Sequence, residues 1–234
     1  MRTCTDCAST AWSAEPVATT SGHWFEARDL SLSRGPRLLL DKLGFALAPG
    51  EAILLQGPNG SGKSSLLRAL LGLSVASGTL SFGGRSFAPG SGLLCPHALY
   101  QGHASGLKGE LTTIENLGLA AALDGFAIGP AALQAALATT GIVREARIAA
   151  RRLSQGQKQR LVLARFALAV REPARRPLWL LDEPSAALDR AGAAMLDTLL
   201  GQHLDQGGAA IIATHLPVLA EAAAVRPLRR IELG

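Results

Sequence analysis

Apolar and polar residues alternate along two stretches near the start of the chain, residues 25–32 and 38–47. Such alternation is typical of strands with one buried face. Pro49-Gly50 then predicts a turn, and residues 52–56 are a short, almost wholly apolar stretch that predicts a buried strand. A glycine-rich loop and a predicted helix over residues 64–73 follow at once. This order of strand, loop and helix indicates the first unit of a parallel α/β fold.

The rest of the pattern predicts further strands and helices in mixed order. They are antiparallel strands around the turns at Gly83-Gly84 and Pro89-Gly90, helices over residues 111–123, 130–140 and 154–169, and buried strands over residues 178–181 and 211–213. We therefore expect an α/β fold with a mixed sheet core, a small antiparallel β part and a helical insert spanning residues 104–155.

The composition agrees with one globular domain. Of the 234 residues, 48% are hydrophobic and only 4% are aromatic, which favours helices packed on a sheet over a β-sandwich. No stretch reaches the roughly 18 uncharged apolar residues that a membrane-spanning helix needs. The 23 Lys and Arg exceed the 18 Asp and Glu by five, which is consistent with anionic partners such as nucleotides, lipid headgroups or nucleic acid.

Residues 1–22 differ from the rest of the chain, because they combine small and polar residues without the apolar segment of a secretory signal. We expect a disordered tail there and a single domain over residues 23–234. The tail holds a C-x-x-C pair, Cys4 and Cys7, but no second Cys or His pair lies nearby, so we expect no metal site. Three cysteines in the whole chain are too few for a disulfide framework and favour a reducing cytoplasm.

The loop between the strand at 52–56 and the following helix matches the pattern G-x-x-x-x-G-K-[ST]. Its glycines let successive backbone N–H groups point at phosphate oxygens, and the helix start adds its positive dipole end. We expect Lys63 to reach the β and γ phosphates and the Ser64 hydroxyl to bind Mg²⁺. The predicted nucleotide-binding residues are Gly57, Pro58, Asn59, Gly60, Ser61, Gly62, Lys63, Ser64 and Ser65.

A second candidate element is the apolar run at 178–181, which ends in two acids, Asp182 and Glu183. Adjacent carboxylates at the end of a buried strand are costly unless a cation compensates for their lost hydration. Mg²⁺ would supply that compensation. We expect Asp182 to hold the metal, directly or through water, and Glu183 to polarise the water that attacks the γ-phosphate.

A third element, Leu153-Ser154-Gln155-Gly156-Gln157, begins the helix predicted after residue 153. A Ser followed by Gly at a helix start again provides free N–H groups for an anion. One nucleotide does not need two phosphate-binding helix starts in the same chain.

These elements together resemble the ATP-binding subunit of ABC transporters, a P-loop NTPase whose signature reads L-S-G-G-Q, here with Gln155 in place of the first Gly. The resemblance extends to Ala187-Leu188-Asp189 and to Thr214-His215. It implies a homodimer with two ATP molecules at the interface, where Ser154, Gly156 and Gln157 of one copy close on the ATP held by the other. By the same resemblance His215 contacts the γ-phosphate and the attacking water, so that Lys63, Glu183 and His215 form the catalytic set.

Two positions depart from the family pattern. An aromatic residue that stacks on adenine is expected where this chain has Arg34, whose guanidinium plane could stack instead. The loop Gln that contacts Mg²⁺ and couples to the membrane subunit aligns with His103, and Gln101 is the alternative for that role.

The same loop narrows the resemblance. Its sequence, Gly102-His103-x-x-Gly106-Leu107-Lys108 followed by Leu111-Thr112 and Glu115-Asn116-Leu117, is similar to that of the ATPase subunit of cytochrome c maturation systems, often named a heme exporter. This implies an integral membrane subunit and heme-handling membrane proteins as partners, a peripheral position at the cytoplasmic face of the inner membrane, and no nucleic acid. An exporter of lipid or drug and a soluble ABC ATPase are the alternatives.

Two further features carry less specific interpretations. Cys95-Pro96, with His97 beside it, resembles a heme-sensing dipeptide, but we do not expect this chain to bind heme. Arginines gather between residues 144 and 176, and we expect a solvated helix face there, with lipid headgroups or the membrane partner as the alternative contact. They are Arg144, Arg147, Arg151, Arg152, Arg175 and Arg176.

Overall fold

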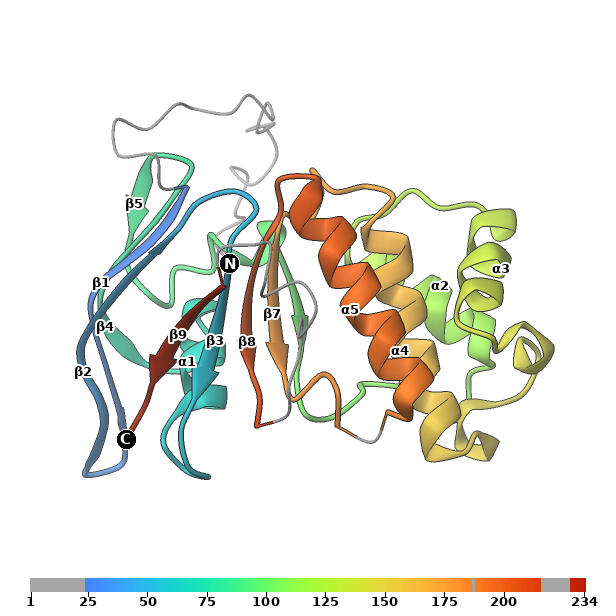
Figure 1. The fold of residues 1–234 in the computed structure, drawn as a ribbon, viewed down its shortest axis with the longest axis horizontal. Helices are drawn as coiled ribbons and strands as arrows, with labels where there is room; N and C mark the ends of the chain where they lie inside the picture. Colours follow the sequence, from blue (N-terminus) through green and yellow to red (C-terminus); the bar gives the residue numbers. More distant parts are fainter. Residues whose placement is uncertain (1–23, 187, 216–227) are drawn as a thin grey trace, which may run out of the picture.

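Short apolar strands form a five-stranded parallel sheet at the centre of the computed structural model, which describes residues 24–186, 188–215 and 228–234 (Figure 1). In spatial order they are β6 (Ala98–Gln101), β7 (Leu178–Asp182), β8 (Ala209–Ala213), β3 (Ala52–Gln56) and β9 (Leu228–Glu232). Parallel strands covered on both faces have to be apolar on both sides. In β7, Trp179 and Leu181 enter one hydrophobic core, whereas Leu178 and Leu180 enter the other.

A second sheet is antiparallel and lies beside the first (Figure 1). Its strands, in spatial order, are β2 (Arg37–Leu47), β1 (Phe25–Arg34), β4 (Ala76–Phe82) and β5 (Arg85–Phe87). β4 and β5 pair across the Gly83-Gly84 turn that the sequence predicts. The inner side chains of this sheet share a core with α1 (Lys63–Leu70) and one face of the parallel sheet.

The other face of the parallel sheet is covered by α4 (Gln155–Ala169) and α5 (Arg190–Asp205). Beyond α4 lie α2 (Thr113–Leu123) and α3 (Pro130–Thr139), on the far side of the molecule from the antiparallel sheet (Figure 1). The short 3₁₀ turns are η1 (Cys95–His97), η2 (Val143–Glu145) and η3 (Ala150–Arg152). The expected helical insert, residues 104–155, contains α2, α3, η2 and η3, and its treatment as a subdomain stays a prediction.

The predicted fold class is confirmed, and so are most of the predicted elements. The strand predictions at 25–32, 38–47, 52–56, 178–181 and 211–213 correspond to β1, β2, β3, β7 and β8, and the helix predictions to α1, α2, α3 and α4. β6, α5 and β9 were not predicted from the sequence. The expected tail at 1–22, with Cys4 and Cys7, lies outside the described residues, as does Ala187.

One interpretation is wrong: Arg176 is not on a solvated face. Its side chain is buried, and its guanidinium donates to the carbonyl oxygens of Asp124, Ala98 and Leu123 at 2.9, 3.2 and 3.1 Å. Buried carbonyl groups need donors, and one guanidinium can serve several of them at once. Among the described residues, no helix is long and apolar enough to span a membrane.

Three aromatic rings join α4, β7 and α5 inside the core. Trp179 stacks on Phe166 with ring centroids 5.1 Å apart, and on His203 with centroids 4.0 Å apart. Nε2 of His203 lies 3.2 Å from the carbonyl oxygen of Ala209, and the side chain is fully buried. Burial disfavours the charged imidazolium and lowers the pKa of His203 from 6.5 to about 4.

This buried histidine predicts a loss of stability in acid. The unfolded chain takes up a proton on His203 near pH 6.5, and the folded chain does so only near pH 4, so stability falls as the pH drops through that window. The lowered pKa corresponds to a loss of about 3 kcal/mol by pH 4. We expect His203→Gln, which cannot titrate, to have a correspondingly flatter profile in urea unfolding between pH 7 and pH 4. Parallel profiles for the two proteins would show that His203 does not stay neutral in the fold.

Candidate functional site

The loop from Gly57 to Gly62 joins the end of β3 to the start of α1. A side chain cannot be accommodated at Gly57, where φ is 141° and a Cβ atom would lie 2.0 Å from the carbonyl oxygen of Leu233. Gly62 is the N-cap of α1 in the left-handed region, with φ of 102°. These glycines let the backbone curl in front of the helix start, as a phosphate-binding loop requires.

Lys63 is the first residue of α1, and its ammonium group lies over this loop. Nζ donates to the carbonyl oxygens of Gly57 at 2.7 Å and Pro58 at 3.0 Å, and only 7% of the residue is exposed. Ser61, inside the loop, is also buried, and its hydroxyl has no hydrogen-bond partner among the residues that the structure describes. A phosphate group at the loop could therefore accept hydrogen bonds from the buried ammonium group of Lys63 and the buried hydroxyl of Ser61.

Ser64 and Asp182 meet although they are 118 positions apart in the chain. The Ser64 hydroxyl donates to a carboxylate oxygen of Asp182 at 2.9 Å, and Asp182 is almost fully buried. A carboxylate and a hydroxyl, completed by phosphate oxygens and water, match how proteins hold Mg²⁺ in nucleotide sites. No cluster of three or more His, Cys, Asp or Glu that could hold a metal exists in the described part of the chain. The residues therefore fit Mg²⁺ bound together with a nucleotide.

Glu183 occupies a strained backbone position at the end of β7. Its φ is 51°, which is unusual for a non-glycine residue, and its N–H donates to the carbonyl oxygen of Ala213 at 2.8 Å. The turn directs the Glu183 carboxylate to the end of β8, where the backbone N–H of His215 donates to it at 3.3 Å. Nε2 of His215 lies 3.6 Å from the Glu183 carboxylate and 3.0 Å from Oδ1 of Asn59. The structure thus brings together the loop after β3, the acids after β7 and the histidine after β8.

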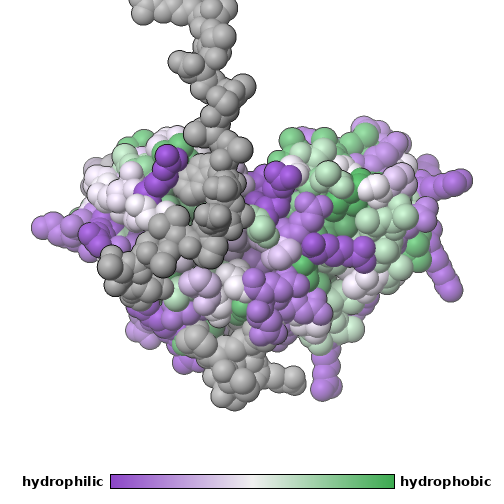
Figure 2. Space-filling model, turned by 90° about the horizontal axis from the view of Figure 1, so that it is seen from above, coloured by the Kyte–Doolittle hydropathy of each residue, from purple (hydrophilic) through white to green (hydrophobic). Residues whose placement is uncertain are grey.

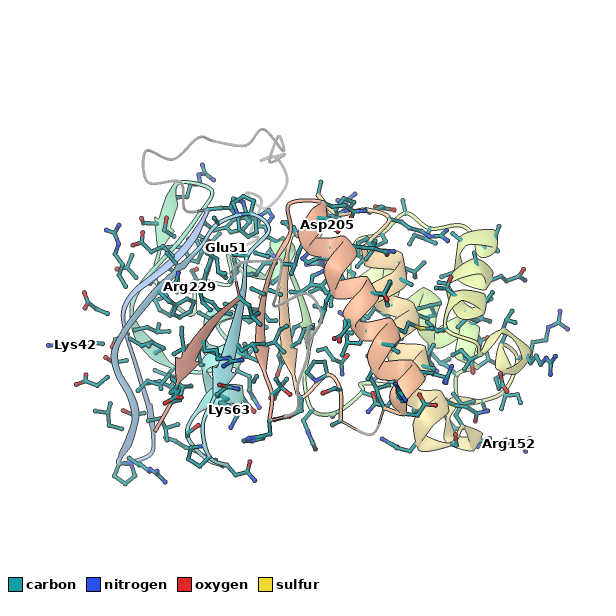
Figure 3. The ribbon with its side chains drawn as sticks, viewed as in Figure 1. Lys42, Glu51, Lys63, Arg152, Asp205 and Arg229 are labelled. Atoms are coloured by element: carbon teal, nitrogen blue, oxygen red, sulfur yellow. The ribbon has the colours of Figure 1, made fainter. Side chains whose placement is uncertain are left out.

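The signature residues lie apart from this cluster. Ser154 caps α4 reciprocally with Gln157: the Gln157 N–H donates to the Ser154 hydroxyl at 3.2 Å, and the Ser154 N–H donates to the Gln157 side chain at 2.9 Å. Gly156 is exposed and faces open space. Figure 3 shows Arg152, two residues before Ser154, at the same lower edge of the molecule as Lys63 but on its opposite side.

The positions that depart from the family pattern lie in different sheets: Arg34 ends a strand of the antiparallel sheet, whereas Gln101 ends a strand of the parallel sheet. Arg34 is exposed at the hairpin between β1 and β2, and β2 borders the phosphate loop, since a Cβ atom at Gly62 would lie 3.4 Å from Leu39. Gln101 is buried at the end of β6, and its amide donates to the Gly102 carbonyl at 2.8 Å. His103 is exposed in the following loop. The nucleotide and coupling roles of these residues stay predictions.

A groove that was not predicted from the sequence lies between α2, α4 and the loop after Gln101. Its volume is about 210 Å³, and its walls are lined by Gln101, Ser105, Gly106, Leu107, Lys108, Asn116, Leu117, Leu119, Ala120, Leu123, Leu161, Val162 and Arg165. Leu119 and Leu123, one helical turn apart on α2, are 38% and 74% exposed. Two exposed leucines four residues apart on a helix suggest a surface that binds something apolar, but only the folded structure shows which leucines of this helix are exposed. Seen from above, Figure 2 shows apolar side chains gathered on the helical side of the molecule.

Comparisons with known proteins agree with this geometry. The ABC transporter family matches residues 40–186. A cytochrome c biogenesis ATP-binding export protein of Cupriavidus necator, CcmA, is 46% identical over 201 residues, which cover 86% of this chain and 83% of the relative. CcmA of Pseudomonas aeruginosa is 40% identical over 191 residues, covering 81% and 92%. A solved ATP-binding subunit of an ABC transporter has a TM-score of 0.74 at 26% identity, covering 90% of this chain and 85% of its own.

The geometry around Lys63 predicts how nucleotide binding is lost. Replacing Lys63 by Ala removes the buried cation of the loop, and we expect the affinity for a fluorescent ATP analogue to fall at least about tenfold, as loss of a charge-assisted contact implies. Lys42→Asn is the matched control, because it removes one exposed lysine at a left-handed position that Asn tolerates. Equal affinities for Lys63→Ala and the parent protein in a titration would place the phosphates elsewhere.

Proposed function

Because the chain belongs to the ABC transporter family, we propose that it is the ATP-hydrolysing subunit of a membrane complex that acts in c-type cytochrome biogenesis, in heme export or in release of a heme chaperone. The observation that carries the activity is the meeting of Ser64, Asp182, Glu183 and His215 around one phosphate-binding loop. The observation that favours the pathway is the identity of 46% and 43% to two CcmA proteins across most of the chain.

The residues around the loop support an in-line transfer of the γ-phosphoryl group to water. The loop N–H groups and Lys63 would hold the phosphates, and Mg²⁺ held by Ser64 and Asp182 would neutralise their charge. The Glu183 carboxylate would accept a hydrogen bond from the attacking water and polarise it. His215, close to both Glu183 and Asn59, would keep that water between the carboxylate and the γ-phosphate.

The separation of the two anion-binding helix starts supports a dimer. Ser154 and Gly156 are exposed, and Arg152, two residues before Ser154, lies on the opposite side of the molecule from Lys63 (Figure 3). A second copy placed head to tail would bring its signature residues to the ATP on Lys63, and the first copy would do the same in return, so that two ATP molecules lie at the interface.

Arg160 of α4 pairs with Asp189, the N-cap of α5, at 3.0 Å. This pair would tie the signature helix to the loop after the acids.

The groove beside Gln101 supports a membrane partner. The groove exposes leucines and lies next to the loop that follows β6. Both features suit the docking of a cytoplasmic segment of the integral membrane subunit. We propose that this segment docks there, which would place the chain peripherally at the cytoplasmic face of the membrane, near heme-handling proteins of the same system. Closure of the dimer on ATP and its reopening after hydrolysis would then move the docked segment.

The proposed catalytic role of Glu183 predicts a trapped dimer. We expect Glu183→Gln to bind ATP as the parent protein does, because the neutral amide leaves Lys63, Ser64 and Asp182 in place. Its turnover should fall at least about 100-fold, since the base is lost. The variant should therefore accumulate as a dimer in light scattering with ATP and Mg²⁺. Glu172→Gln, outside the site, is the control, and hydrolysis by Glu183→Gln at the parent rate would refute the assignment.

The proposed pathway predicts a defect in covalent heme. Deletion of the gene in its native host should remove most c-type cytochromes from a heme-stained gel, and the parent gene should restore them. A gene carrying Lys63→Ala should not restore them, because the complex would lack ATP binding. Intact c-type cytochromes in the deletion strain would reject this pathway in favour of another exporter. A tagged chain recovered without any integral membrane protein would instead favour a soluble ATPase.

A further inference from the structure

β6 is an edge strand, and side chains replace its missing neighbour. Among the described strands it pairs with β7 alone, so the carbonyl groups on its other side face none of these strands. Nη1 of Arg165 donates to the carbonyl oxygen of Tyr100 at 2.9 Å, and Nη1 of Arg176 donates to that of Ala98 at 3.2 Å. Residues two apart in a strand point their carbonyl groups to the same side. Two arginines therefore hold the open edge of β6 just before Gln101.

A single carboxylate holds both arginines. Nε and Nη2 of Arg165 donate to the two carboxylate oxygens of Asp124 at 2.6 and 2.8 Å, a bidentate pair. Nε of Arg176 lies 3.9 Å from the same carboxylate. The side chain of Asp124 is 7% exposed, and those of Arg165 and Arg176 are 21% and 10% exposed. The three residues form a largely buried cluster, which we call the Asp124 cluster.

The cluster connects three elements that belong to different parts of the fold. Asp124 comes directly after the last residue of α2, Arg165 lies on the signature helix α4, and the carbonyl groups belong to β6. Arg176 also donates to the carbonyl oxygens of Leu123 and Asp124, and to that of Cys95 before β6, which attaches the end of α2 to the central sheet. Arg165 and Leu123 both line the groove.

The end of β6 lies close to the metal-binding acid. Tyr100 and Gln101 pair with Leu180 and Leu181, the residues directly before Asp182. A displacement of the Tyr100 backbone would therefore move Gln101 and change the strand pairing directly before Asp182.

We propose that Arg165, oriented by Asp124, is a positioning residue that passes a movement of the groove wall on α2 to the end of β6 and thereby to the ATP site. The inference rests on the proposed docking of a membrane subunit in the groove. When a docked segment displaces the end of α2, the bidentate pair carries the Arg165 guanidinium with it. The Arg165 guanidinium in turn draws on the Tyr100 carbonyl. Arg176 holds α2 and the start of β6 together, so that the movement is a rotation about this anchor.

The test compares Arg165→Lys with Arg171→Lys, an exposed arginine just beyond the same helix. A lysine at 165 keeps the charge beside Asp124, but its single ammonium group cannot bind the carboxylate in a bidentate way and reach the Tyr100 carbonyl as well. ATPase activity is measured for the isolated chain and for the complex purified from membranes through a tag on this chain. We expect the ratio of kcat in the complex to kcat in the isolated chain to fall at least about fivefold in Arg165→Lys, each protein being compared with its own isolated chain. Arg171→Lys should be stimulated as the parent protein is.

Hydrogen exchange in the isolated chain provides a second readout that needs no partner. Arg165→Lys should speed exchange in a peptide covering residues 99–105, and exchange across α4 should stay unchanged. Full stimulation of Arg165→Lys, or unchanged exchange at 99–105, would overturn the positioning role while the parent complex still shows stimulation. A parent complex with no stimulation and no membrane subunit would instead refute the proposed function, and this inference with it. A variant that unfolds would show fast exchange throughout, and this too contradicts a local role.

Discussion

The burial of β3, β7 and β8 on both faces is the constraint on which the rest of the structure depends. Strands covered on both sides hold no polar residue along their length, so polar groups can appear only where the strands end. Because the strands are parallel, these ends meet at one edge of the sheet. This edge therefore brings together residues that lie far apart in the sequence. They are the phosphate loop after β3, Asp182 and Glu183 at the end of β7, and His215 after β8.

The same constraint bears on the proposed dimer. The edge of the sheet carries Lys63, Ser64, Asp182 and Glu183, the residues proposed to contact the phosphates, the metal and the attacking water. The second helix start with free N–H groups, at Ser154, belongs to the helical layer that covers the sheet and is exposed, and Arg152, two residues before it, lies on the opposite side of the molecule from Lys63 (Figure 3). Completion by a second copy agrees with this geometry, and it would make ATP a component of the interface.

The sequence could predict what depends on local pattern. The glycines of the phosphate loop, the apolar run before Asp182 and the cap at Ser154 are each readable from neighbouring residues, and all lie where expected. β9 was missed because its residues, among them Arg229 and Arg230, are partly exposed and become a strand only by pairing with β3. Arg176 was misread because its environment also depends on distant parts of the chain. The residues next to it in the sequence do not show that four carbonyl groups from distant segments accept hydrogen bonds from it. The groove was missed because it forms between elements that the chain brings together only on folding.

The Asp124 cluster is better explained by the carbonyl groups that it orients than by a contribution to the stability of the fold. A buried set of two guanidinium groups and one carboxylate carries an uncompensated positive charge, and the cost of removing such groups from water often equals or exceeds their attraction. An apolar contact of similar volume would hold α2 against the sheet at least as firmly. It could not, however, fix the direction of the Tyr100 and Ala98 carbonyl groups at an edge that lacks a neighbouring strand. Directional bonds are needed where the geometry of the next residue matters, and here the next residue is Gln101, beside the strand that ends in Asp182. The energetic cost of the cluster is thus consistent with the proposal that the end of β6 moves together with α2 and α4.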